Sequence, residues 1–184
     1  MQAEYSLLCR TPEWELFPVC EEEKIAYLPW SPLKGGWLAG RIKRSQGPPT
    51  EGRVSWAQKI GWQETNYDAI ANEHTWAVLD TVEAIAKETG RTQAQVSLRW
   101  AMQRPGVTSV IIGARTMQQL ADNLAAAEFS LTDEQMARLN EVWLRICSFL
   151  SLLTTIAPTS GVPTSNAIPL QFSRSNLRTR SENS

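Results

Sequence analysis

The sequence predicts an α/β fold whose parallel strands form part of a larger barrel. Strand-like and helix-like segments alternate along the chain, which is typical of parallel strands joined by helical crossovers. The apolar run SVIIG at residues 109–113 favours a strand buried on both faces. Only three such strands are predicted, and three alone would leave two apolar edges unpaired. We therefore expect a piece of a larger closed sheet.

The composition favours a cytoplasmic protein with one core. The chain has 184 residues, of which 42% are hydrophobic, and its net charge is −1. This charge balance argues against a general affinity for nucleic acid or for an anionic membrane. No apolar stretch reaches the ~18 residues of a membrane span, and the first residues lack the basic region of a signal peptide. The cysteines have no metal-like spacing, and we expect free thiols at Cys9, Cys20 and Cys147.

Two strands are predicted in the first part of the chain. The segments AEYSLL at 3–8 and KIAYLPWSP at 24–32 are rich in apolar and aromatic residues, and prolines end the second of them. A short helix is predicted between these strands, with an interruption near Pro18. Residues 34–66 are dense in glycine and proline, and this density predicts a long loop.

Four helices are predicted in the second part. The first starts near residue 69 and stops at Gly90, a typical residue just past a helix end. Its apolar face consists of Val78, Val82, Ile85 and Ala86. Three capping boxes, each a threonine followed three residues later by a glutamine, begin the other helices near 93–104, 117–126 and 133–145. The boxes are Thr92 with Gln95, Thr116 with Gln119, and Thr132 with Gln135.

The chain divides into two parts of different character. Residues 1–145 carry the predicted strands and helices. Residues 146–184 are rich in serine, threonine, proline and asparagine, and no helical period continues past Leu153. Such a composition does not build a packed core, so we expect a disordered tail.

The segment SVIIGARTMQQLADNL, residues 109–124, is a candidate phosphate site. Gly113 would let a ligand approach the backbone, and the free N–H groups of the helix after Thr116 would favour an anion. Arg115 adds a cation that suits an adenosine 2′-phosphate, while Gln119 and Asn123 could reach a purine. The alternative is a glycine that ends a strand, a solvated arginine and an ordinary capping box. Local features support the two interpretations equally.

The segment LPWSPLKGGWLAGR, residues 28–41, is a second candidate. Trp30 lies at the end of a predicted strand, where parallel α/β folds bind ligands, and its indole could stack on a flat ring. A diphosphate could be lined by Ser31, the N–H of Leu33, Lys34 and Arg41. A core tryptophan followed by a glycine-rich loop is the competing interpretation, and from this segment alone it is the favoured one.

The remaining polar residues predict no catalytic centre. The single histidine, His74, has no partner for a catalytic triad in its segment NEHTWAVL, so we expect a packing role. The run Glu21–Glu23 is expected to be a solvated face. No metal-ligating set and no catalytic residue is predicted.

Three motifs in the same order give the sequence a resemblance to the C-terminal half of the aldo-keto reductases, over about residues 1–142. QAEYSLL resembles the sixth strand of their (β/α)8 TIM barrel, YLPWSPLKGGWLAGR the seventh strand and its loop, and VIIGARTMQQLADNL the eighth strand with its adenosine 2′-phosphate site. The resemblance implies a partial barrel of strands six to eight and NADPH as cofactor. It assigns cofactor contacts to Gln2, Trp30, Ser31, Leu33, Lys34, Arg41, Arg53, Gly113, Arg115, Gln119 and Asn123.

The departures from the family are as informative as the matches. The family's catalytic Asp, Tyr, Lys and His come from the N-terminal half of the barrel, and their motifs do not occur here. The resemblance therefore implies a truncated chain that is inactive alone, although its parent reduces aldehydes or ketones by hydride transfer. A non-enzymatic NADPH-binding or interaction module, which self-associates or binds a partner through exposed strand edges, is the alternative. A chain that does not fold stably is a third. The substrate is not predicted.

Overall fold

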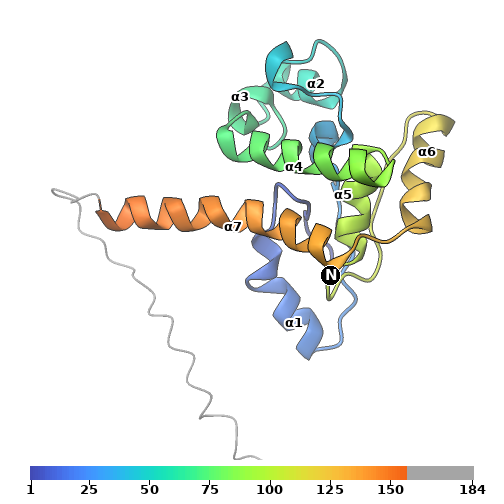
Figure 1. Ribbon diagram of the computed structural model, residues 1–184, viewed down its shortest axis with the longest axis vertical. Coiled ribbons are helices and arrows are strands. Elements are labelled where there is room, and N and C mark those ends of the chain that lie inside the picture. The colour runs from blue at the N-terminus through green and yellow to red at the C-terminus, as the bar shows by residue number, and fades with distance from the viewer. Residues whose placement is uncertain (157–184) are drawn as a thin grey trace, which may run out of the picture.

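The computed structural model describes the backbone of residues 1–156 and the side chains of residues 1–144. This part of the chain is mainly helical (Figure 1). Its α-helices are α1 (Leu16–Glu22), α2 (Gly52–Ile60), α3 (Tyr67–Ile70), α4 (Glu73–Thr89), α5 (Gln93–Met102), α6 (Met117–Leu124) and α7 (Asp133–Ile156). Four short 3-10 helices are η1 (Thr11–Glu13), η2 (Lys34–Ala39), η3 (Arg44–Gln46) and η4 (Ala125–Glu128). None of the described helices combines the length and apolar character that crossing a bilayer requires.

The three predicted strands lie side by side but do not form a regular sheet within the described residues. A parallel bridge joins Glu4 to Trp30, and a second parallel bridge joins Tyr27 to Val107. The three segments are thus adjacent and parallel, in the order expected of neighbouring barrel strands. The prediction of three extended strands is wrong, because these segments form only isolated bridges in the described part of the chain.

Local chemistry explains why these ladders stay short. Pro29 and Pro32 have no N–H group and cannot donate to a neighbouring strand. The carbonyls of Tyr27 and Pro29 are two residues apart, yet they accept from Thr108 and Ile111, which are three residues apart. A regular parallel ladder advances by two residues on both strands, so this mismatch interrupts the register.

The predicted capping boxes explain where the later helices begin. The Thr92 hydroxyl accepts from the Gln95 N–H and the Gln95 side chain accepts from the Thr92 N–H, as predicted for α5. Reciprocal bonds of the same kind start α7 at Thr132. Thr116 caps α6, but the Gln119 side chain accepts from the N–H of Arg115 instead of completing the box. Helix α4 ends at Gly90 in the left-handed conformation, as its sequence predicts.

The long loop predicted over residues 34–66 is wrong, because α2 and two 3-10 helices occupy much of it. Glycines that suggest a loop are turn and cap residues here. Gly61 ends α2 with a φ of 71°, and its N–H donates to carbonyls of the last turn. The predicted interruption near Pro18 is also absent, since Pro18 lies in the first turn of α1, where its missing N–H costs no helical hydrogen bond.

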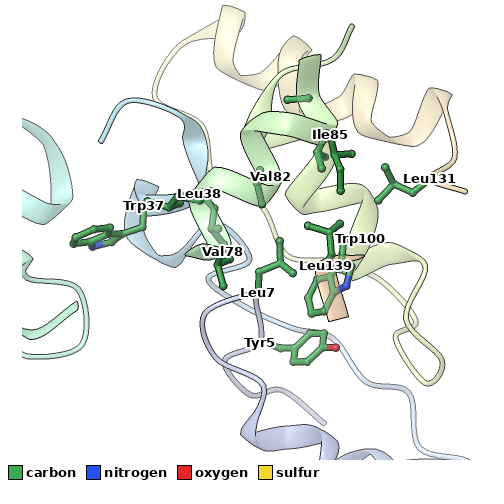
Figure 2. Close-up of a cluster of buried hydrophobic side chains, with 14 of the residues drawn as sticks. Tyr5, Leu7, Trp37, Leu38, Val78, Val82, Ile85, Trp100, Leu131 and Leu139 are labelled. Carbon is green, nitrogen blue, oxygen red and sulfur yellow. The ribbon is translucent and has the colours of Figure 1, made fainter. Parts of the chain in front are cut away.

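The core lies between α4, α5 and α7 and the segment at residues 1–8 (Figure 2). Helix α4 contributes the predicted apolar face to it. Each fully buried aliphatic or aromatic side chain contributes on the order of 1.5–3 kcal/mol to stability. The largest fully buried side chains include Tyr5, Leu7, Val78, Val82, Ile85, Trp100 and Leu139. Trp37 lies at one end of this cluster and stacks on Tyr67 at a centroid distance of 5.6 Å.

Helix α7 packs against α4 and continues to Ile156 (Figure 1). The predicted helix end at residue 145 is therefore too early. Most of the predicted tail at 146–184 falls on residues 157–184, which lie outside the described residues. The side chain of Cys147 is also outside the described part of the structure. Cys9 and Cys20 are free thiols, as predicted.

Candidate functional site

The two segments predicted to bind a cofactor leave the bridged region at the same edge. The N–H of Ile111 donates to the carbonyl of Pro29 at 2.8 Å, one residue before Trp30 on one segment and two residues before Gly113 on the other. On the other side of Trp30, its N–H donates to Ala3 and its carbonyl accepts from Tyr5. Parallel α/β folds bind ligands beyond such carboxyl ends. The candidate site is therefore built at this edge.

The turn after Trp30 presents unpaired backbone donors. Trp30 is 39% exposed, so its indole is partly open to solvent. The N–H of Lys34 closes the turn on the carbonyl of Ser31 at 2.8 Å, and both residues have positive φ, 57° for Ser31 and 47° for Lys34. The N–H groups of Ser31 and Leu33 donate to no acceptor in the described part of the chain. This turn can offer two N–H groups to an anion.

The side chain of Lys34 is already paired. Its Nζ lies 2.7 Å from Oε1 of Glu4, and the two side chains are only 11% and 15% exposed. Glu4 belongs to the neighbouring segment and bridges to Trp30 through its backbone. Lys34, which the resemblance places along a diphosphate, therefore has a competing anionic partner within the chain.

The other predicted residues near this turn are more accessible. Arg53 of α2 lies close to it, because a Cβ on Gly35 would come within 3.6 Å of the Arg53 Cδ. The Arg53 guanidinium also lies 6.0 Å from the ring centre of Trp62. Arg41 and Gln2 are both exposed. The structure thus gathers Arg53 beside the turn and leaves Arg41 and Gln2 open to solvent.

The start of α6 forms the other half of the candidate site. Arg115 is exposed and forms no ion pair with any residue whose side chain the structure describes. It directly precedes Thr116, the N-cap of α6, whose first helical turn has free N–H groups that favour an anion. Gly113 is exposed, and a Cβ there would meet nothing within 4 Å. Gly113 is also not among the glycines with positive φ, so neither its backbone conformation nor the space around it requires glycine.

The two amide side chains of this segment bind its backbone. Gln119 accepts from the N–H of Arg115 at 2.9 Å. Asn123 is buried, and its Nδ2 donates to the carbonyl of Gly113 at 3.4 Å. Both contacts fold the segment at 113–115 back onto α6. Contact of either amide with a purine stays a prediction.

A buried polar network that the sequence did not predict lies behind the site. The Tyr5 hydroxyl donates to Glu13 at 2.6 Å, and the guanidiniums of Arg10 and Arg104 pair with the same carboxylate. Burial raises the pKa of Tyr5 far above its ordinary value. Burial also opposes ionisation of Glu13, but its hydrogen bonds to Arg10 and Tyr5 outweigh this effect and lower its pKa. Arg104 lies two residues after the end of α5, whereas Tyr5, Arg10 and Glu13 lie near the start of the chain. Because these residues are far apart in the sequence, no local motif could reveal the network.

His74 takes the packing role that the sequence predicts. It lies in the first turn of α4, with its ring centre 6.4 Å from that of Trp143 on α7. Its Nδ1 is buried without a hydrogen-bond partner in the described residues. Burial lowers its pKa, so the neutral ring is the form that the fold favours.

The parallel bridges, and the helices that lie between the bridged segments in the chain, define an α/β arrangement. The sequence profile of the aldo/keto reductase family matches residues 1–144, and the chain belongs to this family. A solved structure of a thermostable aldo-keto reductase in complex with epalrestat is similar in fold, with a TM-score of 0.52 and 22% identity, over 77% of this chain and 38% of that one. The expected partial barrel thus has a matching neighbour, although its strands are not regular here.

Individual relatives match the same part of the chain. An uncharacterized oxidoreductase of Bacillus subtilis is 34% identical over 77% of this chain and 39% of the relative. The NADH-specific methylglyoxal reductase of Escherichia coli is 28% identical over 77% of this chain and 41% of the relative. A putative voltage-gated potassium channel subunit beta of Schizosaccharomyces pombe is 30% identical over the same two shares, 77% and 41%. The chain spans about two fifths of the length of these relatives.

Proposed function

We propose that this chain binds NADPH across the turn at residues 30–34 and the start of α6. In the complete family fold, this binding serves the reduction of an aldehyde or ketone by hydride transfer. The hydrogen bond between Ile111 and Pro29 carries the proposal, because it brings the two halves of the site to one edge. The cofactor supplies the hydride, and the residues of this chain bind and orient it.

The donors present suit a dinucleotide phosphate. The exposed Arg115 and the free N–H groups at the start of α6 match an adenosine 2′-phosphate, because a helix N-terminus and a guanidinium both favour an anion. The N–H groups of Ser31 and Leu33 suit a diphosphate, and the partly exposed indole of Trp30 suits a flat nicotinamide ring. A relative named as NADH-specific makes the choice between NADPH and NADH the point that needs testing.

We further propose that the chain alone does not reduce carbonyl compounds. A carbonyl that receives hydride needs a proton donor whose pKa lies near the working pH. Burial raises the pKa of Tyr5 far above its ordinary value and that of Tyr27 to about 12. The third tyrosine, Tyr67, packs against both Trp37 and Trp76. These environments do not prepare a tyrosine to donate a proton.

Titration of the full chain with NADPH and with NADH tests the proposal. Quenching of tryptophan fluorescence reports binding, and Arg115→Gln is compared with Arg138→Gln, which removes an arginine on α7 that pairs with Glu88. We expect the unmodified chain to prefer NADPH by at least about tenfold, the effect of one charge-assisted hydrogen bond. Arg115→Gln should remove this preference and the α7 variant should keep it.

Two results would contradict the proposal. Equal affinities for the two cofactors in the unmodified chain would remove the role of Arg115. Steady turnover of a reactive aldehyde by the isolated chain would overturn the proposed inactivity. Adenosine 2′,5′-bisphosphate should compete with NADPH, whereas AMP should compete weakly.

A non-enzymatic interaction module is the second candidate. Large apolar residues at the bridged segments are exposed, with Met1 at 46%, Ile25 at 40% and Ile111 at 37%. Such side chains suit self-association or a partner at the open edges. Light scattering after size-exclusion chromatography distinguishes the two: a discrete oligomer stabilised by NADPH favours the module, and a monomer argues against it. A cytoplasmic location stays a prediction from the sequence.

A further inference from the structure

We propose that Glu4 and Lys34 form a latch on the candidate cofactor site. In the free chain Glu4 holds the Lys34 ammonium, and on binding of a dinucleotide the ammonium exchanges this carboxylate for the diphosphate. The inference rests on the proposed function and adds to it a residue, Glu4, that sets the affinity by competing with the ligand.

The geometry of the pair is that of a specific contact between two segments. Nζ of Lys34 lies 2.7 Å from Oε1 of Glu4, and both side chains are largely buried. Glu4 and Trp30 form a parallel bridge, so the carboxylate stands beside the turn that begins after Trp30. The N–H groups of Ser31 and Leu33, which have no acceptor in the described residues, belong to this same turn. An anion bound by these N–H groups would therefore be held by the turn to which Lys34 also belongs.

The backbone at Lys34 has a strained conformation. Its φ is 47°, a left-handed conformation that is uncommon for residues with a Cβ. The next two residues, Gly35 and Gly36, also have positive φ, but as glycines they adopt it without the strain that Lys34 carries. Strained residues of this kind persist where surrounding contacts fix them, and they cluster at ligand-binding sites and switches. The ammonium of Lys34 thus reaches Glu4 from a conformation that a glycine would adopt more easily.

Charge pairing makes Glu4 and a bound diphosphate compete for the Lys34 ammonium. An ammonium that is largely buried is costly without a partner, so Lys34 keeps an anion beside it in either state. With a diphosphate in place, the Glu4 carboxylate would repel the ligand and compete for the same ammonium. Removing the negative charge of Glu4 should therefore strengthen binding, whereas removing the positive charge of Lys34 should weaken it.

The experiment measures NADPH affinity of the full chain with Glu4→Gln, Lys34→Met and the double variant. The Gln variant keeps an oxygen that can accept from Lys34. We expect it to tighten NADPH binding about threefold to tenfold, the effect of removing one nearby charge in a partly solvated site. Lys34→Met should weaken binding by a similar factor, and the double variant should show no gain from Glu4→Gln. Lys34→Arg should retain the response to Glu4→Gln.

Two further measurements separate a latch from a purely structural ion pair. Glu88→Gln removes the same charge from the exposed pair with Arg138 and should change affinity less than twofold. The ¹⁵N resonance of the Lys34 ammonium should shift when NADPH is added to the unmodified chain. In Glu4→Gln, the free chain should already lack the signature of the carboxylate partner.

The outcomes are distinct. Binding of NADPH to the unmodified chain, with unchanged or weaker binding to a folded Glu4→Gln variant, would overturn the latch alone. A Lys34 resonance that does not respond to NADPH would do the same. Absence of NADPH binding in both the unmodified chain and Glu4→Gln would overturn the proposed function and the latch together. Thermal unfolding of each variant shows whether it is folded.

Discussion

The backbone of Ile111 is hydrogen-bonded to that of Pro29: the N–H of Ile111 donates to the Pro29 carbonyl at 2.8 Å. Because Pro29 has no N–H, the contact between these two residues depends on this one donor. It joins two segments that are far apart in the sequence, two residues before Ser31 on one segment and six residues before the start of α6 on the other. Together with the hydrogen bonds between Tyr27 and Thr108, it sets the relative position of the two halves of the candidate site.

Ile111→Pro removes this donor. We expect NADPH affinity to fall by about tenfold, because the link between the segments that lies nearest the site is lost and the carbonyl of the buried Pro29 loses its partner, a loss on the order of 1 kcal/mol or more. Isothermal titration measures the affinity. Ile111→Ala is the matched control, since it shortens a side chain that is 37% exposed but keeps the N–H. An equal loss in both variants would show that the side chain, and not the hydrogen bond, is responsible.

Ile85→Ala tests the core between α4 and its neighbours. Ile85 is fully buried, so we expect the free energy of unfolding to fall by about 2–5 kcal/mol through lost burial and the cavity that remains. Urea unfolding followed by circular dichroism provides the measurement. The same substitution at Ile60, which is 54% exposed on α2, should change stability by less than about 0.5 kcal/mol. Similar effects at the two positions would contradict the packing described for α4.

Gly35→Ala tests the turn of the candidate site. Gly35 has a φ of 64°, and a Cβ there would lie 2.9 Å from Cγ2 of Thr65. Gly61 has a φ of 71°, but a Cβ there would meet nothing within 4 Å. Both alanine variants carry the left-handed strain of roughly 1 kcal/mol, and only the first adds a steric clash. Thermal unfolding should therefore show a larger loss for Gly35→Ala, and equal losses would argue against the close approach of Thr65.

A pH titration tests the environment of His74. Burial lowers its pKa below the ordinary value of 6.5, so the unfolded chain binds a proton at a pH where the folded chain does not. The stability associated with the neutral ring is present above pH 6.5 and is lost as the pH falls through the folded pKa. The chain has one histidine, so His74→Gln should flatten the pH dependence of the melting temperature just below pH 6.5. An unchanged slope in this variant would contradict a buried neutral ring.

The sequence predicted the helices well where the signal is local. Thr92 and Thr132 with their glutamines are capping boxes, and Gly90 ends α4, because each of these interactions spans only a few residues. It predicted the strands poorly, because the register between residues 24–32 and 107–111 depends on pairing across the chain. The glycines of residues 34–66 were ambiguous for a related reason. A glycine that caps a helix and one that lies in a loop have the same local signature.

For the site, the sequence pointed to both segments but not to their partners. Trp30 and Arg115 were singled out by their place after strand-like runs, and the structure brings their segments to one edge. The pairing of Lys34 with Glu4 had no sequence signal, because the two residues lie 30 positions apart. The amide contacts of Gln119 and Asn123 with the backbone at 113–115 were likewise not predicted.

By itself, the sequence determined the family, the helix starts and the residue types available for a dinucleotide phosphate. These follow from short motifs in which each residue acts on neighbours within one or two helical turns. Only the tertiary structure decided that the predicted strands form isolated bridges and that a hydrogen bond between Pro29 and Ile111 joins the two halves of the site. The tertiary structure likewise decided that the carboxylate of Glu4 pairs with the ammonium of Lys34. Those contacts depend on how distant segments pack against one another, and the energy of such packing cannot be inferred from a local sequence pattern.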